Sequence, residues 1–389
     1  MASFNSTCTN NALIILEGLR LSVTSIKRKI RPSKKYTGTT EEICRAIIND
    51  CFDSKNNYFR VSPNNFKQFW ARDFGMCCES LIYLGYNKEV KQTLLYAMEK
   101  YEKQGQITTN IMPNGHPLDF PSHTPESSAY MLHSLILLND KKLIEKYKTF
   151  FSKMAEYIFE NDIDKKTGLL RKDKHFSSMK DYAFRQSDCY NNCLLAMFAN
   201  DLKKIKVNTP LSNYNYKKNI EKAFFKDYFL EDLSGRKILG EYIFASDANI
   251  FPFWTKVFDA QKKDKSLFKK IIINIQDKKL DYPWPLKYTT KEEASKKMHI
   301  ANILCPGYET DTQWIHLGLC YMKIVSEIDK PLLNKYLFQY ETLIQKHKTF
   351  YEVYDNNGQV FNRLLYKSDE AMLWCSIFLQ LYLENKKNT

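Results

Sequence analysis

Glycine is scarce in this sequence, with 12 residues in a chain of 389. A dinucleotide-binding fold needs glycine-rich turns, and neither a P-loop nor a G-x-S-x-G nucleophile pattern is present. The ten cysteines include no C-x-x-C pair, and the seven histidines do not stand at metal-ligand spacing. These absences argue against nucleotide, zinc and serine-nucleophile chemistry, so we expect neither a metal nor an organic cofactor.

No apolar run approaches the length of a membrane-spanning helix. The short apolar stretch at residues 12–16 lacks the basic region that precedes the apolar part of a secretory signal. The cysteines, with Cys77 and Cys78 adjacent, are typical of small packing residues in a reducing compartment. We therefore expect a cytoplasmic protein.

Positive charge is in excess, with 58 lysines and arginines against 44 acidic residues and a net charge of +14. Most lysines are scattered in pairs, as on the outer faces of helices, so a nucleic-acid partner is not expected. The one concentrated block is KRKIRPSKK at residues 27–35, where any contact with a polyanion would fall. We expect residues 1–38 to form either an amphipathic basic helix or a flexible segment, separate from a domain at 39–389.

Apolar residues recur at intervals of three and four over most of the chain, and alternation with period two is scarce. This pattern predicts an all-α protein of about twelve helices. The expected helices span residues 40–54, 73–86, 89–103, 125–139, 141–160, 187–205, 213–226, 247–259, 264–276, 310–327, 331–349 and 368–385.

The connections between these helices alternate between very short turns and long loops rich in aromatic and polar residues. One such loop is FSSMKDYAFRQ at residues 176–186. Long ordered loops are usually functional, and here they precede every second helix. Six hairpins with their long loops at one end predict an (α/α)6 barrel, and two stacked helical domains are the alternative.

Six segments at the expected starts of the inner helices combine a carboxylate with hydroxyl, amide or aromatic groups. Taken singly, such residues cap helices. Four of the five tryptophans, however, lie in or beside these segments. Aromatic faces stack on sugar rings while carboxylates and amides bind hydroxyls, so the mixture indicates a carbohydrate site. The segments are residues 70–73, 124–128, 185–188, 246–249, 309–314 and 366–370.

The sequence also resembles a known family. FWARDFGMCCESLIYLGY is similar to the I-R-D-F helix of neutral and alkaline invertases and to the T-R-D segment of glucoamylases, both six-hairpin glycosidases. TPESSAYMLHSLILL, RQSDCYNNCLLAMFANDLKK, PGYETDTQWIHLGLCYMKI and FYEVYDNNGQVFNRLLYK resemble further invertase segments in the same order. The resemblance covers roughly residues 40–385.

This resemblance implies Glu126 as the general acid, where the invertases have aspartate, and Glu352 as the general base. It also implies that Arg72 and Asp73 hold hydroxyl groups of a terminal sugar. In a barrel, we expect these two residues to face the central pocket and to pair with each other, with Trp70 as a wall of the site. Asp188, Asp247 and Asp311 are reserve candidates for the acid. Further expected substrate contacts are Gln186, Trp284, Tyr308, Gln313 and Trp314.

The chain departs from the invertase pattern at Ala129–Tyr130, which replaces a tryptophan pair, and at Thr312–Gln313, which replaces two glycines. Sucrose is therefore not implied as the substrate. A helix N-terminus also stabilises the anion of Glu126, so its surroundings would have to raise the pKa of this carboxyl group for it to act as an acid.

We therefore expect an inverting glycoside hydrolase that removes a terminal, α-linked glucosyl-type unit from a small oligosaccharide or glucoside, by a two-carboxylate mechanism. An alternative is a catalytically inactive barrel that acts as a sugar sensor or scaffold, with the basic block as a tether. A sugar epimerase would need a central histidine pair, and no expected inner-helix start offers one.

Overall fold

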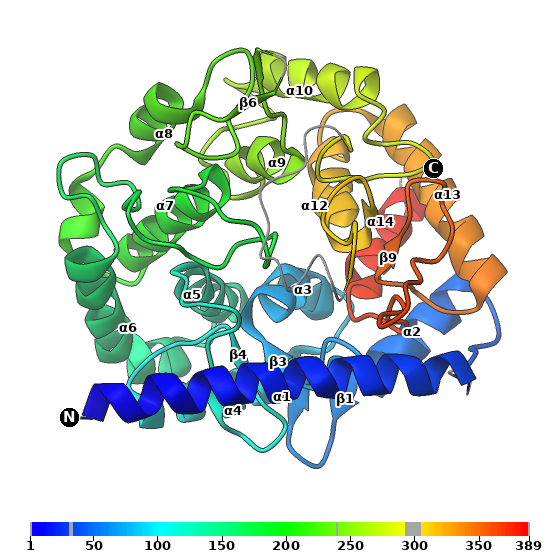
Figure 1. The fold of residues 1–389 in the computed structure, drawn as a ribbon, viewed down its shortest axis with the longest axis horizontal. Coiled ribbons are helices and arrows are strands. Elements are labelled where there is room, and N and C mark those ends of the chain that lie inside the picture. Colours follow the sequence, from blue (N-terminus) through cyan, green and yellow to red (C-terminus); the bar gives the residue numbers. More distant parts are fainter. Residues whose placement is uncertain (1, 31–33, 239, 292–304, 388–389) are drawn as a thin grey trace.

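The computed structural model describes residues 2–30, 34–238, 240–291 and 305–387, with side chains from Leu16 onward. Helices dominate, and the strands among these residues are two residues long. Part of the basic block, residues 31–33, lies outside the described residues. Figure 1 shows two concentric rings of helices, with a further long helix across one end.

Among the described residues, six helices form the inner ring, and each packs against the next around a closed circle (Figure 1). The contact between α14 and α3 closes the circle. The inner helices are α3 (Ala71–Tyr83), α5 (Glu126–Leu138), α7 (Cys189–Lys204), α9 (Ser246–Trp254), α12 (Ile315–Val325) and α14 (Cys375–Lys387).

In the described part of the chain, six outer helices cover the inner ring, each packed on one or two inner helices. They are α2 (Thr40–Cys51), α4 (Asn87–Gln104), α6 (Lys141–Asn161), α8 (Tyr216–Phe224), α10 (Lys265–Asp277) and α13 (Lys330–His347). A short 3-10 helix, η1 (Pro210–Asn213), precedes α8. The predicted (α/α)6 barrel is therefore confirmed, and the arrangement of two stacked domains is excluded.

The sequence pattern explains which helices lie inside. Ten of the 11 residues of α12 are buried, with Lys323 as the exception, because neighbours surround this helix. The outer helix α6 instead buries residues at intervals of three and four and begins with an Asp140 side-chain cap. Inside the ring, a Cβ atom on Gly75 of α3 would lie 2.5 Å from the Tyr130 ring of α5, so only glycine permits this close packing.

Short strands tie the long loops together. β3 (Phe69–Trp70), β4 (Asn110–Ile111) and β5 (Pro117–Leu118) form one antiparallel sheet, and β8 (Gln313–Trp314) pairs with β9 (Val353–Tyr354). Two smaller pairs are β1 (Phe52–Asp53) with β2 (Tyr58–Phe59), and β6 (Lys237–Ile238) with β7 (Glu241–Tyr242).

Two predicted helix starts are wrong. The helix expected from residue 310 begins at Ile315, because Gln313 and Trp314 pair with β9 instead. The helix expected from residue 368 begins at Cys375, because the Ser368 amide donates a hydrogen bond to the Phe361 carbonyl in an extended segment. Carboxylates at residues 369 and 370 therefore lie on a loop and not at a helix N-terminus.

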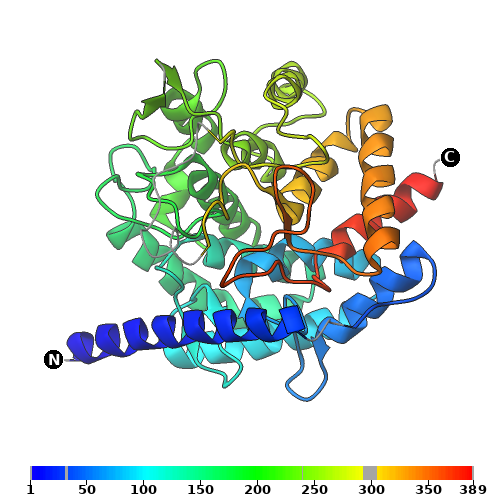
Figure 2. The same ribbon diagram turned by 45° about the vertical axis from the view of Figure 1, so that its right-hand side comes forward.

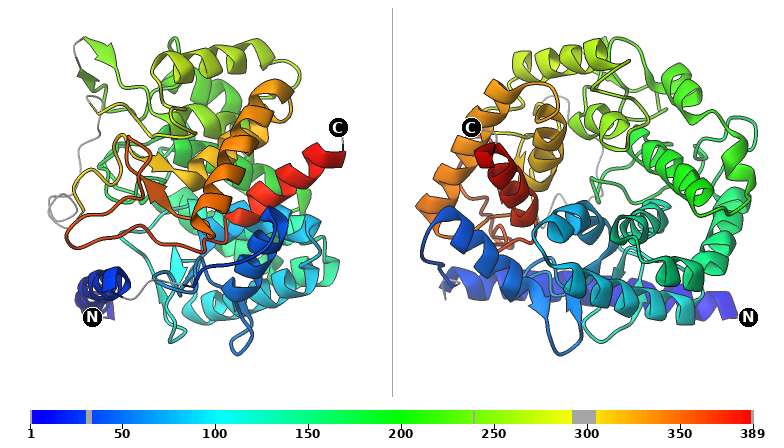
Figure 3. Two further views of the ribbon diagram at one scale, coloured as in Figure 1. Left: turned by 90° about the vertical axis from the view of Figure 1, so that its right-hand side faces the viewer. Right: turned by 180° about the vertical axis from the view of Figure 1, so that it is seen from behind.

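The first helix, α1 (Ala2–Ile30), crosses the end of the ring that faces the viewer in Figure 1. Figure 2 shows it outside the two rings, and in the reversed view of Figure 3 it lies behind them. Within the described residues, none of the helices combines the length and apolarity that a membrane crossing requires.

Candidate active site

A cavity lies at the end of the barrel that α1 crosses, and Gly18 and Leu21 of α1 form part of its wall. About 1090 Å³ of space lies between its walls, part of it open to solvent, which suits a ligand of one or a few sugar rings. Its carboxylates, aromatic rings and guanidinium group include Asp73, Asp181, Glu352, Trp70, Phe120, Trp314, Trp374, Tyr308, Tyr366 and Arg72.

Aromatic rings from separate loops form the walls. Trp70, the residue before α3, packs edge to face on Phe120 with 5.9 Å between ring centroids. The Trp314 indole N–H donates to the Tyr308 backbone carbonyl at 2.8 Å, and the two rings pack edge to face with 4.7 Å between centroids. The Trp70 indole nitrogen is buried and has no hydrogen-bond partner among the described residues. This donor is therefore suited to a hydroxyl group of a ligand.

Arg72, in the first turn of α3, organises one side of the cavity. Its Nη2 donates to both Asp181 oxygens at 3.1 Å, and its Nη1 donates to the Ser178 carbonyl at 2.5 Å. Nη1 also lies 3.5 Å from Oε1 of Glu126. The Arg72 guanidinium therefore pairs with two carboxylates. Asp181 lines the cavity, and Glu126 does not.

Burial raises the pKa of both carboxyl groups in this cluster. The pKa of Glu126 rises to about 7 and that of Asp181 rises above its ordinary value, while Arg72 opposes both shifts. Glu126 is almost completely buried, and its Oε2 has no hydrogen-bond partner among the described residues. Because the single guanidinium cannot fully neutralise two carboxylates, this arrangement favours a proton within the cluster.

Glu352 stands on another loop, directly before β9. The Tyr308 hydroxyl donates to its Oε1, while its Oε2 accepts from the Tyr366 hydroxyl at 2.6 Å and from the Asp369 amide at 2.9 Å. Burial raises the pKa of Glu352 to about 7, and the two tyrosine hydroxyls and the amide oppose that rise. Donors on both oxygens fix the orientation of this carboxylate.

Asp73 and Trp374 form a third polar contact in the cavity. The Trp374 indole N–H donates to Asp73 Oδ1 at 2.9 Å, and burial raises the pKa of Asp73 to about 6. The expected pairing of Arg72 with Asp73 is wrong, because the Arg72 guanidinium turns to Asp181, Ser178 and Glu126 instead. Both residues nevertheless line the cavity, as the sequence predicted.

The structure brings six of the thirteen predicted site residues together. Glu352, Trp70, Arg72, Asp73, Tyr308 and Trp314 line the cavity. The other seven do not line this cavity. They are Glu126, Gln186, Asp188, Asp247, Trp284, Asp311 and Gln313.

The three predicted aspartates outside the cavity have structural partners. Asp188 caps α7 by accepting from the Asn191 amide at 2.9 Å. Asp247 accepts from Arg185 at 2.6 and 3.1 Å. Asp311 accepts from the exposed Asn356 side chain at 2.9 Å. Their carboxylates accept hydrogen bonds from other groups of the protein, so the geometry does not favour any of the three as the general acid.

The remaining three predicted contacts also lie outside the cavity. The Gln186 backbone amide donates to Asp232 at 2.8 Å, and the exposed Gln186 lines a separate pocket. The Gln313 side chain donates to the Tyr282 carbonyl at 2.7 Å. Trp284 packs on Tyr354 with 5.2 Å between ring centroids.

Sequence reasoning missed several cavity residues, above all Asp181, His316 and Trp374. Asp181 lies in the middle of the long loop at residues 176–186, away from the helix starts at which carboxylates were expected. Burial, together with the Arg72 charge, lowers the pKa of His316 well below its ordinary value, so this imidazole is neutral. No group of three or more histidine, cysteine or acidic side chains in the described part of the chain is arranged to hold a metal ion.

Comparisons with known proteins identify the fold. No family model matches the chain. No curated protein matches it either. Solved structures do match, among them a glycosidase with 11% sequence identity and a TM-score of 0.65, which covers 89% of this chain and 97% of its own.

Two further matches are enzymes that act on different sugars. The GH63 mannosylglycerate hydrolase of Thermus thermophilus has 10% identity and a TM-score of 0.61, over 88% of this chain and 100% of that one. A rhamnosidase from Klebsiella oxytoca with rhamnose bound has 10% identity and a TM-score of 0.60, over 90% of this chain and 63% of that one. The chain therefore has the six-hairpin (α/α)6 fold of these glycosidases.

Proposed function

We propose that the protein is a glycoside hydrolase whose reaction takes place in the cavity at the α1 end of the barrel. One observation carries the proposal: Asp181 and Glu352 come from different loops and line one cavity that has aromatic walls. Solved structures with this fold include a glycosidase in complex with glucose and a rhamnosidase with rhamnose bound, which supports a sugar ligand. Glycosidases of most families use two carboxyl groups in this way.

Asp181 is the general acid in this proposal, in place of the Glu126 expected from the sequence. Asp181 is the carboxyl group of the Arg72 cluster that reaches the cavity, and its side chain is 23% exposed against 2% for Glu126. Glu126 competes with Asp181 for the Arg72 guanidinium, which helps Asp181 to keep its proton. Asp181 would donate that proton to the glycosidic oxygen of the leaving group.

Glu352 is the general base. Its oxygens accept from two tyrosine hydroxyls and one amide, and all three donors favour the ionised form. An ionised Glu352 would take a proton from a water molecule that attacks the anomeric carbon. Attack from the face opposite the leaving group inverts the anomeric configuration, so we propose an inverting reaction.

The substrate proposed is a small neutral glycoside with a terminal glucosyl-type unit. The described lining of the cavity presents four carboxyl groups against the one guanidinium of Arg72, so an anionic sugar would be repelled. They belong to Glu17, Asp73, Asp181 and Glu352. Leu21 and Ser22 of α1 form part of the wall, which limits the room for a long chain. Trp70 and Trp314 supply the aromatic faces for the sugar ring.

Proton NMR tests the proposal by following the anomer released from sucrose, maltose, isomaltose, trehalose, kojibiose and maltotriose. Asp181→Asn and Glu352→Gln should each lower kcat by about 10²–10⁴-fold, the usual share of an acid or base. Asp311→Asn, in a loop outside the cavity, is the matched control. Retained configuration would overturn inversion, and saturable sugar binding without hydrolysis would indicate an inactive sugar-binding barrel.

A further inference from the structure

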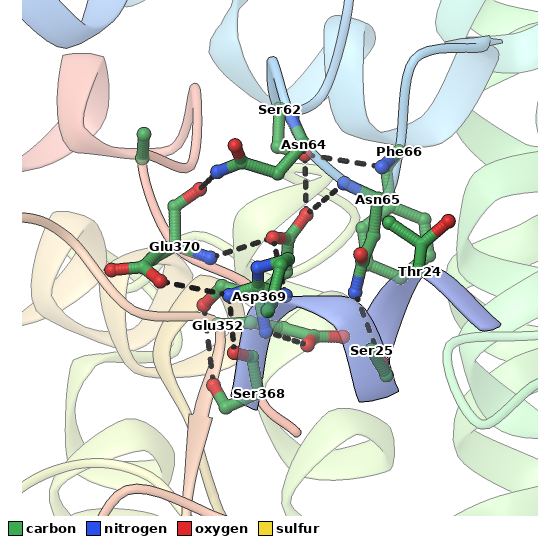
Figure 4. A network of polar contacts seen from close by, with 12 residues as sticks. Thr24, Ser25, Ser62, Asn64, Asn65, Phe66, Glu352, Ser368, Asp369 and Glu370 are labelled. Carbon is green, nitrogen blue, oxygen red and sulfur yellow. Dashed lines mark hydrogen bonds and ion pairs between the residues drawn. The ribbon is translucent and has the colours of Figure 1, made fainter. Parts of the chain in front are cut away.

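The helix α1 packs on the barrel with a polar face. Glu17, Ser25 and Arg28 are its buried residues from Leu16 onward. Glu17 accepts from the Gln68 side chain. The Asn65 side chain donates to the Ser25 hydroxyl at 3.4 Å (Figure 4). Arg28 lies 3.0 Å from both Asp369 and Glu370. The contacts that hold α1 on the barrel are therefore largely polar and ionic.

The opposite face of α1 is apolar and faces away from the barrel. Its side chains recur at intervals of three and four residues, so they form one stripe along the helix. Their exposed fractions run from 40% for Ile26 to 77% for Ile30. The apolar stripe consists of Leu16, Leu19, Val23, Ile26 and Ile30. This helix has the reverse of the usual orientation, in which the apolar face is buried.

The stripe continues onto a neighbouring loop. Lys29 donates to the carbonyls of Arg363 and Leu364 at 2.5 and 3.0 Å, and the Leu364 side chain is 85% exposed. Twelve large hydrophobic side chains are exposed in the described part of the chain, and half of them belong to the apolar stripe or to Leu364. Apolar exposure gathered in this way marks an interaction surface.

The charges beside the stripe indicate what covers it. Lys27 and Lys29 are exposed at its C-terminal end. Lys34 and Lys35 follow close by in the sequence, but they already pair with Asp50 and Glu370. The one acidic residue of α1 is Glu17, which faces the barrel. If α1 paired with α1 of a second copy, Lys27 and Lys29 would find no carboxylate on the partner helix. Phosphate and carboxylate headgroups of lipids would match them.

We propose that the apolar stripe, with Leu364 and the lysines beside it, binds the surface of a bilayer that contains anionic lipids. The helix lies in the plane of the interface, with its apolar side chains among the acyl chains and its lysines among the headgroups. Its polar face stays on the barrel, so α1 lies between the cavity and the lipid. This surface does not depend on the proposed glycosidase activity.

Co-sedimentation of the full chain with vesicles tests the proposal. Binding is expected to vesicles that contain phosphatidylserine, more weakly to phosphatidylcholine alone, and less at high salt. The double variant Leu19→Asp/Val23→Asp should bind at least about tenfold more weakly, because charge in the stripe opposes insertion. Lys27→Gln should weaken binding about fivefold, equivalent to about 1 kcal/mol per lysine near an anionic surface.

Matched controls distinguish binding by this surface from nonspecific adsorption of the protein to vesicles. Ile273→Asp/Phe338→Asp changes two exposed apolar residues on α10 and α13, and Lys153→Gln removes an exposed charge from α6. Neither control should alter vesicle binding, and thermal unfolding should show that all variants fold. Absence of wild-type binding, or equal binding by the Leu19/Val23 variant, would overturn the proposal. A wild-type dimer in light scattering that this variant dissociates, without lipid binding, would assign the stripe to a second copy instead.

Discussion

The Arg28 guanidinium lies 3.0 Å from the Asp369 carboxylate, and the backbone amide of Asp369 donates to the Glu352 carboxylate at 2.9 Å. Figure 4 shows Asp369 at the centre of this polar network. A single residue therefore joins α1 to the candidate base.

Replacing Arg28 should destabilise the protein, because Asp369 and Glu370 would stay buried without this cation. Removal of one partner from a buried ion pair typically costs about 3–5 kcal/mol, so Arg28→Met should lower the denaturation midpoint clearly. Lys27→Met, at an exposed position on the same helix, is the control and should leave the midpoint unchanged. Equal midpoints for the two variants would show that α1 is not held by this contact.

The Tyr308 hydroxyl should set the acidic limb of the pH–rate profile. Glu352 must be ionised to act as a base, and with its pKa raised to about 7, activity should fall as the pH drops below that value. Tyr308→Phe removes a donor that favours the ionised form, so the acidic limb should move to higher pH. Tyr282→Phe, at an exposed ring outside the cavity, should leave the kcat/KM profile unchanged.

Glu126→Gln distinguishes an acid from a residue that acts through Arg72. If Asp181 is the acid, this variant keeps activity, but Arg72 then stabilises the Asp181 anion more strongly. The pKa of Asp181 falls, so the basic limb of kcat/KM moves to lower pH. A loss of kcat as large as that of Asp181→Asn, at every pH, would instead make Glu126 the acid.

Trp70 should contribute to sugar affinity in two separable ways. Trp70→Phe keeps an aromatic face but removes the indole N–H that has no partner among the described residues. Trp70→Ala removes both, so KM should rise further, by about tenfold for each 1.4 kcal/mol of binding lost. Trp284→Phe changes a tryptophan outside the cavity, and KM should stay at the wild-type value. Identical KM values for all three variants would remove Trp70 from the sugar site.

Glu352 should lower the stability of the fold at neutral pH. Its pKa is about 7 in the folded protein against an ordinary 4.5. Burial of this carboxyl group therefore leaves the free energy of unfolding unchanged below pH 4.5 and lowers it most above pH 7. Glu352→Gln should therefore raise the free energy of unfolding above pH 7, by at most roughly 3 kcal/mol, with the gain vanishing towards pH 4.5. Urea titrations at both ends of this range would detect the difference, and a gain independent of pH would contradict the assignment.

The fold was predictable because its signals are local and repeated. Apolar spacing marked the twelve barrel helices, and Trp70, Arg72 and Asp73 stand next to the start of α3, where a scan of helix starts finds them. The starts of α12 and α14 were not predictable in this way. Gln313 and Trp314 pair with residues about 40 positions away in β9, and a two-residue strand is too short to show alternation.

The site was only half predictable, because a helix-start carboxylate has the same local sequence whether it faces a ligand or the protein. Asp188 and Asp73 both begin inner helices, yet Asp188 caps its own helix while Asp73 reaches the cavity. Asp181 lies in the middle of a loop, and its role depends on Arg72, 109 residues earlier. Such partners are assembled by tertiary structure and leave no pattern within a sequence window.

The ring of inner helices closes between α14 and α3, which come from opposite ends of the barrel sequence. The bond from Trp374 to Asp73 joins residues 301 positions apart within the cavity wall. Contacts over such separations form slowly, because a long loop must close before they can stabilise anything. During synthesis the early hairpins can fold as they emerge, but the cavity is complete only when the last helix arrives. A chain that stops before Cys375 thus contains every carboxylate of the site and yet lacks the helix that closes the barrel around them.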